Sequence, residues 1–257
     1  MRLRADVFGE KGGTPLLVAH GLLGAARNWG ALSRRLGRAR RVIAVDMRNH
    51  GASPWSDAMD YPAMAADLAE TIDAEAGGRA DVLGHSMGGK AAMALALTAP
   101  DRVARLIVAD IAPVAYGHSY DAILAAMRAL DAGAITRRGQ ADAALAPAIP
   151  DPAMRAFVVQ NLEVGPEGSR WRPNVAVLSA RIGAILGWPD AWPHPRFEGP
   201  TLFLRGGRSD YVTDAMRPAI AALFPRAEHR AIEGAGHWLH AEKPEPFLQA
   251  VEAFLAD

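Results

Sequence analysis

The stretch Gly84-His85-Ser86-Met87-Gly88 decides how the rest of the chain is interpreted. It follows a short apolar run, Asp81–Leu83, and precedes a helical pattern, Met87–Ala99. Glycines two positions before and after the serine let a strand and a helix approach closely, while the turn holds the serine in a strained conformation with its hydroxyl exposed. The same glycines would also suit a turn that only packs the helix on the strand. With a strand before it and a helix after it, the pattern predicts a nucleophile elbow with Ser86 as the attacking group.

Short apolar runs alternate with helical patterns on both sides of this turn, which is typical of a parallel sheet with crossover helices. A Pro-before and Gly-after pattern brackets one of these helices, Met64–Ala76. We therefore expect an α/β fold with a mostly parallel central sheet flanked by helices. The expected strands are Leu16–Ala19, Val42–Val45, Asp81–Leu83, Val103–Ala109, Thr201–Leu204 and Glu228–Ile232.

The pattern changes between Ala112 and Phe197, where we find helical segments and no convincing strand. Turn signals rich in glycine and proline separate these segments. We predict a helical cap over residues 112–197, inserted into a core domain formed by residues 1–111 and 198–257, and we expect the cap to control substrate choice rather than chemistry. Its expected helices are Tyr120–Leu130, Thr136–Leu145, Pro152–Leu162 and Val175–Leu186.

A serine hydroxyl needs a base, and eight histidines compete for that role. His237 follows Gly234-Ala235-Gly236 and lies between the last predicted strand and the last predicted helix, so its loop should lie at the sheet edge where the strands end. Two carboxylates could orient it. Asp210 follows the strand after the cap. Asp110 follows the strand after the elbow helix, and a helix of about 13 residues and the returning strand each span about 20 Å, which brings Asp110 back to the edge that holds the serine.

Two backbone amides are candidates for an oxyanion hole. The amide of Met87 lies at a helix N-terminus, where N–H groups point outward and the dipole favours negative charge. A second donor should come from another loop, and His20-Gly21-Leu22-Leu23-Gly24 follows the first predicted strand at a suitable place. We assign the second donor to Leu22 N–H and expect His20 to shape the loop.

Composition excludes several classes of function. The 257 residues carry 28 basic and 28 acidic side chains, and this zero net charge argues against a nucleic-acid binder. There is no cysteine, which removes thiolate nucleophiles, metal sites built on sulfur and disulfides. We find no secretory signal and no apolar run long enough to span a membrane, and we expect a cytoplasmic protein. Nothing in the sequence specifies an oligomeric state.

The sequence resembles the α/β-hydrolase superfamily and, within it, the YbfF-like esterases. The resemblance implies an α/β-hydrolase fold with a helical cap after the sixth strand, a serine ester or thioester hydrolase without cofactor or metal, and oxyanion amides at Leu22 and Met87. It also favours Asp110 over Asp210 as the triad acid. The matching segments are His20-Gly-Leu-Leu-Gly24 with Asn28-Trp29, Asp46-Met-Arg-Asn-His-Gly-Ala-Ser-Pro54, Gly84-His-Ser-Met-Gly-Gly-Lys90, Asp110-Ile-Ala-Pro-Val114 and Gly234-Ala-Gly-His-Trp238.

The predicted reaction is hydrolysis of a small acyl ester or thioester through an acyl-enzyme on Ser86. A haloalkane dehalogenase is excluded because it needs a carboxylate at the elbow. A carbon–carbon bond hydrolase or a cofactor-free perhydrolase would use the same serine and histidine and stays open as an alternative. A purely ligand-binding module on this fold is a further alternative.

Overall fold

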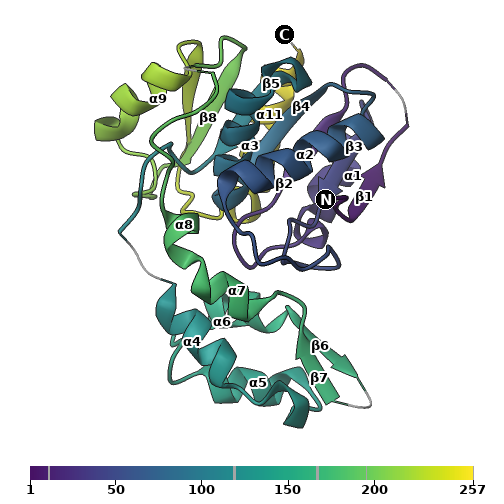
Figure 1. Ribbon diagram of the computed structural model, residues 1–257, viewed down its shortest axis with the longest axis vertical. Coiled ribbons are helices and arrows are strands. Elements are labelled where there is room, and N and C mark those ends of the chain that lie inside the picture. Colours follow the sequence, from purple (N-terminus) through teal and green to yellow (C-terminus); the bar gives the residue numbers. More distant parts are fainter. Residues whose placement is uncertain (11, 118–119, 166–167, 195, 257) are drawn as a thin grey trace.

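A computed structural model describes all residues of the chain except 11, 118–119, 166–167, 195 and 257. Within the described residues, seven strands form one sheet in the order β1-β3-β2-β4-β5-β8-β9 (Figure 1). β1 pairs with β3 in antiparallel fashion, and every other neighbouring pair is parallel. The α/β architecture predicted from the sequence is confirmed. The strands are β1 (Ala5–Phe8), β2 (Leu16–Ala19), β3 (Val42–Val45), β4 (Ala80–His85), β5 (Val103–Ala109), β8 (Thr201–Gly206) and β9 (Ala227–Ile232).

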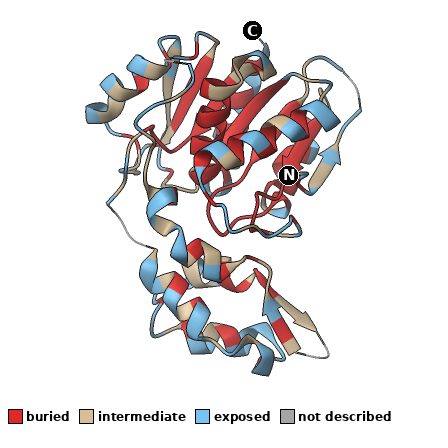
Figure 2. Cartoon of the chain, in the orientation of Figure 1, coloured by how far each residue is buried: buried red, intermediate tan, exposed pale blue. Residues whose placement is uncertain are grey.

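Helices cover both faces of this sheet because successive strand residues point to opposite sides. Leu17 and Ile43 belong to one apolar cluster with residues of α2 and α3, whereas Leu16 and Val42 belong to a second cluster with residues of α1 and α11. Figure 2 shows buried residues concentrated in the sheet and in α3, which packs with α2 on one face of the sheet. The core helices are α1 (Gly30–Leu36), α2 (Tyr61–Glu75), α3 (Met87–Thr98), α9 (Arg217–Leu223), α10 (Leu239–Glu242) and α11 (Pro244–Ala256).

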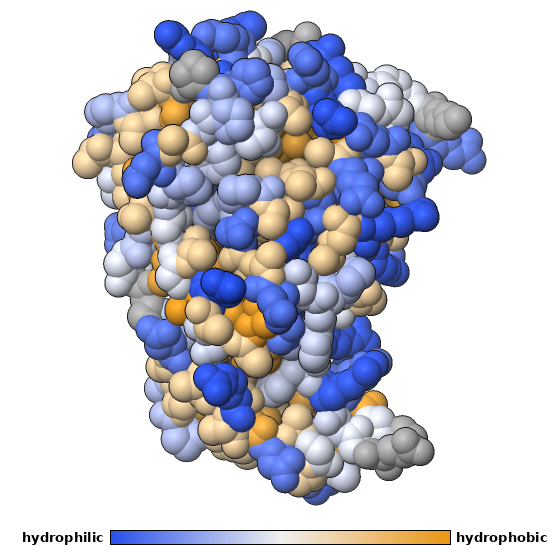
Figure 3. All heavy atoms as spheres, in the orientation of Figure 1, coloured by the Kyte–Doolittle hydropathy of each residue, from blue (hydrophilic) through white to orange (hydrophobic). Residues whose placement is uncertain are grey.

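Residues 112–197, which we call the insertion, lie between β5 and β8 and form a smaller body below the sheet in Figure 1. α8 joins it back to the core, and the visible face carries apolar residues at this junction (Figure 3). The insertion follows the fifth strand along this chain, so its predicted place after a sixth strand was wrong. Its elements are α4 (Asp121–Ala129), α5 (Arg138–Leu145), α6 (Pro152–Val159), β6 (Leu162–Gly165), β7 (Gly168–Trp171), α7 (Val175–Ala180) and α8 (Ile182–Leu186).

The insertion differs from its predicted all-helical character. β6 and β7 form an antiparallel pair with Leu162 opposite Trp171, where the sequence suggested only a helix end and a turn. α6 ends before Leu162 because Asn161 turns its side chain to the core and donates to the Leu23 carbonyl at 2.7 Å. β6 and β7 are too short and too polar for a regular alternation of apolar and polar residues to be visible in the sequence.

Other departures are local. β1 and α1 were missed, and the predicted helix Val175–Leu186 is divided at Arg181 into α7 and α8. No helix among the described residues is long and apolar enough to cross a membrane.

Candidate active site

Ser86 occupies a sharp turn between β4 and α3. Its φ of 52° and ψ of −120° lie in a region that residues other than glycine rarely adopt, so the turn is strained. The flanking glycines are required by close backbone approaches. A Cβ at Gly84 would lie 2.2 Å from the Gly88 oxygen, and one at Gly88 would lie 2.4 Å from the Ala19 oxygen. The local sequence therefore folds as an elbow that presents the serine above the sheet.

A continuous chain of polar contacts joins the serine, the histidine and one of the two candidate acids. His237 Nε2 is 3.1 Å from Ser86 Oγ, and His237 Nδ1 is 2.8 Å from Asp110 Oδ2. Asp210 is instead exposed, and no hydrogen bond or ion pair joins it to any described residue. The structure thus brings Ser86, His237 and Asp110 together and leaves Asp210 apart.

The Asp110 carboxylate is fully buried and surrounded by donors. Its Oδ1 accepts from the Gly206 amide at 2.9 Å, and its Oδ2 accepts from the Ser209 hydroxyl as well as facing His237. A φ of 52° at Asp110 turns the chain at the end of β5 so that the side chain reaches these donors. Sequence reasoning missed Ser209, which no motif distinguished from other loop serines.

His237 is held from two further sides. The ring of Tyr211 stacks on the imidazole, with centroids 3.7 Å apart and planes 19° apart. His85 Nε2 donates to the His237 carbonyl at 2.9 Å, and burial lowers the pKa of His85 well below its ordinary value, so this ring is neutral. His85 thus packs behind the elbow. Tyr211 was missed because its contact depends on two distant loops.

The loop that carries Leu22 is shaped by buried neutral histidines. His20 Nε2 accepts from the Met47 amide at 2.9 Å while its Nδ1 donates to the Gly21 carbonyl at 2.7 Å. His50 Nε2 accepts in the same way from the Leu23 amide at 3.1 Å. Burial lowers the pKa of His20 to about 4 and that of His50 to about 3, so both remain neutral near pH 7.

The two amides proposed for the oxyanion hole lie beside the serine. Leu22 and Met87 line the same cavity as Ser86, and neither backbone N–H has a hydrogen-bond partner among the described residues. Met87 is the first residue of α3, where an amide has no acceptor within the helix. Both donors are therefore available to a ligand.

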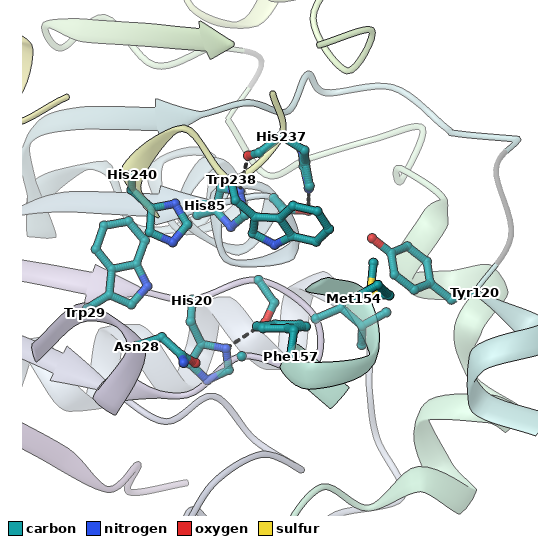
Figure 4. A pocket seen from close by; sticks show the side chains of 14 residues that line it. His20, Asn28, Trp29, His85, Tyr120, Met154, Phe157, His237, Trp238 and His240 are labelled. Carbon is teal, nitrogen blue, oxygen red and sulfur yellow. Dashed lines mark hydrogen bonds between the residues drawn. The ribbon is translucent and has the colours of Figure 1, made fainter. Parts of the chain in front are cut away.

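Ser86 lies where two cavities meet. The outer cavity places Met154 and Phe157 of α6 across from His237 and Trp238 (Figure 4). The inner cavity is small and extends from Ser86 toward Lys90 and α8. No group of three or more potential metal-binding side chains occurs among the described residues.

Residues 14–244 match the family described as alpha/beta hydrolase fold. The chain belongs to this family. It is 42% identical over 247 residues to Esterase YbfF of Escherichia coli (strain K12), a match that covers 95% of this chain and 94% of the relative. It is 39% identical over 250 residues to the sn-1-specific diacylglycerol lipase ABHD11 of Mus musculus, covering 94% and 80%. The solved structure of a marine microorganism esterase superposes with a TM-score of 0.93 at 37% identity, covering 98% of this chain and 99% of that one. The resemblance to YbfF-like esterases inferred from the motifs is confirmed.

Proposed function

We propose that the protein cleaves carboxylic esters through an acyl-enzyme on Ser86, with His237 as general base and Asp110 as the acid that orients it. At the level of reaction class, the chain is a carboxylic ester hydrolase of the esterase and lipase type. The observation that carries the finer proposal is the unbroken path from Ser86 Oγ through the imidazole to Asp110. Asp210 has no part in this proposal because it is exposed.

In the first step, Ser86 Oγ attacks the ester carbonyl and His237 Nε2 takes the hydroxyl proton. Asp110 accepts from Nδ1–H, which holds the ring in the tautomer whose Nε2 has a free lone pair. The Leu22 and Met87 amides donate to the oxyanion that forms. The leaving alcohol takes the proton from His237 and departs, which leaves the acyl group on the serine.

In the second step, water enters beside His237 and loses a proton to Nε2 as it attacks the acyl-enzyme. The same two amides hold the second oxyanion, and the acid leaves as Ser86 regains its proton. A thioester would follow the same steps with a thiol as leaving group, so we keep thioesters within the proposal. The cytoplasmic location expected from the sequence stays a prediction.

The insertion completes the site as a cap. Phe157 and Met154 form one wall of the outer cavity, and α8 closes the inner one. Arg27 donates to the Gln160 carbonyl at 2.9 Å, which holds the end of α6 against the loop that carries Leu22. We therefore propose that these walls select substrates without taking part in bond making. No specific contact favours carbon–carbon hydrolysis, perhydrolysis or a purely binding role.

Replacing the nucleophile tests the proposed function. Ser86→Ala should lower hydrolysis of a short-chain ester on the order of a millionfold, because removing a nucleophile from a triad has about this effect. A fluorophosphonate should add its mass to Ser86 in the wild type and not in this variant. Ser33→Ala is the matched control, since the buried Ser33 hydroxyl has no partner among the described residues and lies in α1. Activity above a few per cent in Ser86→Ala would refute the assignment.

A further inference from the structure

The turn that carries the Leu22 amide is held by a residue of the insertion. The Gly24 N–H donates to the Gly21 carbonyl at 2.9 Å, which closes a tight turn with Leu22 and Leu23 at its two central positions. Asn161, which lies between α6 and β6, donates its side-chain N–H to the Leu23 carbonyl at 2.7 Å. The insertion thus contacts the backbone of this turn one residue after the proposed oxyanion donor.

Leu23 has a backbone conformation that needs this support. Its φ of 59° lies in the left-handed region, where glycine is the usual residue and a leucine is strained. Such a conformation persists only where its surroundings fix it. Two contacts do so, because His50 Nε2 accepts from the Leu23 N–H at 3.1 Å and Asn161 donates to the Leu23 carbonyl. Leu23 is buried and no other donor among the described residues reaches this carbonyl, so loss of Asn161 would leave a buried acceptor unpaired.

The contacts of Asn161 require a carboxamide in one orientation. Its Oδ1 accepts from Arg27 at 3.1 Å, while its Nδ2 donates to Leu23. A guanidinium only donates and a carbonyl only accepts, so the amide cannot turn over without losing both contacts. Asn161 is fully buried, so solvent does not replace either partner. An aspartate at this position would still accept from Arg27 but would place a second acceptor against the Leu23 carbonyl.

We propose that Asn161 is a positioning residue for the oxyanion hole, because it holds the Leu23 peptide in the conformation that fixes the direction of the Leu22 N–H. This inference rests on the proposed ester hydrolysis at Ser86. Asn161 lines neither of the two cavities that meet at Ser86, so it acts through the backbone and not on the substrate. Phe157, one turn earlier, instead lines the outer cavity with Leu22 (Figure 4). The insertion therefore supports the reaction at Asn161 and shapes the cavity at Phe157.

The expected effect is the partial loss of one donor. Removing an oxyanion-hole donor outright lowers kcat by about a hundredfold to a thousandfold. Without its partner the Leu23 carbonyl is free to turn, the strained φ relaxes and the Leu22 N–H rotates away from the oxyanion, and hydrogen bonds weaken steeply as they lose alignment. The Met87 amide keeps its place, because it belongs to the first turn of α3. We therefore expect Asn161→Asp to lower kcat by about tenfold to a hundredfold.

The test combines hydrolysis of p-nitrophenyl butyrate with inhibition by propyl trifluoromethyl ketone, which carries the same acyl chain. Ser86 Oγ adds to the ketone carbon, its proton passes to His237, and the carbonyl oxygen becomes an oxyanion in the hole. The inhibition constant Ki thus reports the binding of a tetrahedral oxyanion. Asn161→Asp should lower kcat and raise Ki by the same factor, about tenfold to a hundredfold, while KM changes by less than about threefold.

Gln160→Glu is the matched control. It makes the same change from amide to carboxylate on the neighbouring residue, where the side-chain oxygen keeps the hydrogen bond that it accepts from Asn28 at 3.1 Å. Both variants add one negative charge beside Arg27, but only Asn161→Asp removes a donor from the turn. Gln160→Glu should therefore change kcat and Ki by less than about twofold.

The outcomes separate the inference from the function on which it rests. A kcat and a Ki that Asn161→Asp leaves within twofold, even with a lower Tm, would overturn the positioning role, and so would a change confined to KM. An equal loss in Gln160→Glu would assign the effect to the added charge and overturn it as well. If Asn161→Asp does not fold, Asn161→Ala removes the donor without adding charge and is judged in the same way. A wild type that neither hydrolyses the ester nor is labelled at Ser86 by a fluorophosphonate would instead refute the proposed function.

Discussion

Replacing Asp110 by asparagine should disable the proposed base while leaving the fold intact. Asp110 Oδ1 accepts a hydrogen bond from the Gly206 amide, and Oδ2 accepts hydrogen bonds from the Ser209 hydroxyl and from His237 Nδ1. A carboxamide has one acceptor oxygen and one NH₂ donor. Its oxygen best stays with the Gly206 amide, which leaves the NH₂ facing the imidazole. His237 Nδ1 must then accept a hydrogen bond, Nε2 carries the proton, and the ring can no longer deprotonate Ser86.

The expected loss is large for kcat and small for stability. An imidazole held in the wrong tautomer lowers kcat by about ten-thousandfold, or about 5 kcal/mol of transition-state free energy. The disturbed hydrogen bonds of Asp110→Asn should lower the free energy of unfolding by about 1–3 kcal/mol, and each kcal/mol lowers Tm by about 2–4 °C for a chain of this size. The variant therefore stays folded at 25 °C.

The assay measures kcat with a soluble short-chain ester at saturation, together with Tm by circular dichroism. Asp210→Asn is the matched control, because its exposed carboxylate has no described partner, and it should change kcat by less than about twofold and stability by less than about 0.5 kcal/mol. A ten-thousandfold loss confined to Asp210→Asn, or an Asp110→Asn variant with more than a tenth of the wild-type kcat, would refute this reasoning.

Two further predictions concern stability. Gly88→Ala should yield little folded protein, because its Cβ would lie 2.4 Å from a backbone oxygen of β2, whereas Gly183→Ala has open space and should keep or raise Tm; equal Tm values for the two variants would contradict the steric argument. In the unfolded chain His20 binds a proton below about pH 6.5, whereas in the folded chain burial lowers its pKa to about 4. As the pH drops from about 6.5 to about 4, the free energy of unfolding should therefore fall by about 1.4 kcal/mol per pH unit for each such histidine. Urea titrations at pH 7 and pH 5 measure this fall, and equal free energies at the two values would rule it out.

Features that depend on a few neighbouring residues could be predicted from the sequence alone. The elbow at Ser86 is one, because the space for Gly84 and Gly88 is set by the turn between one strand and one helix. The strands of the parallel sheet are others, since their apolar runs are bounded by turn residues. The pairing of β6 with β7 was missed because each strand has only four residues, too few for an alternation of apolar and polar residues to emerge.

The choice of acid shows what the sequence by itself determined and what only the tertiary structure decided. Spacing brings both Asp110 and Asp210 to the sheet edge where His237 lies, because each follows a strand and those strands, β5 and β8, are neighbours. Which carboxylate turns inward depends on partners far along the chain. Asp110 is held by the amide at the end of β8 and by a hydroxyl from the loop after β8, whereas Asp210 in that loop faces solvent. Lys90 is similar, since its place one turn beyond Ser86 follows from helix geometry, but its burial depends on carbonyls at the end of α8. The sequence sets the positions along the chain, and packing between distant segments sets which side chains meet.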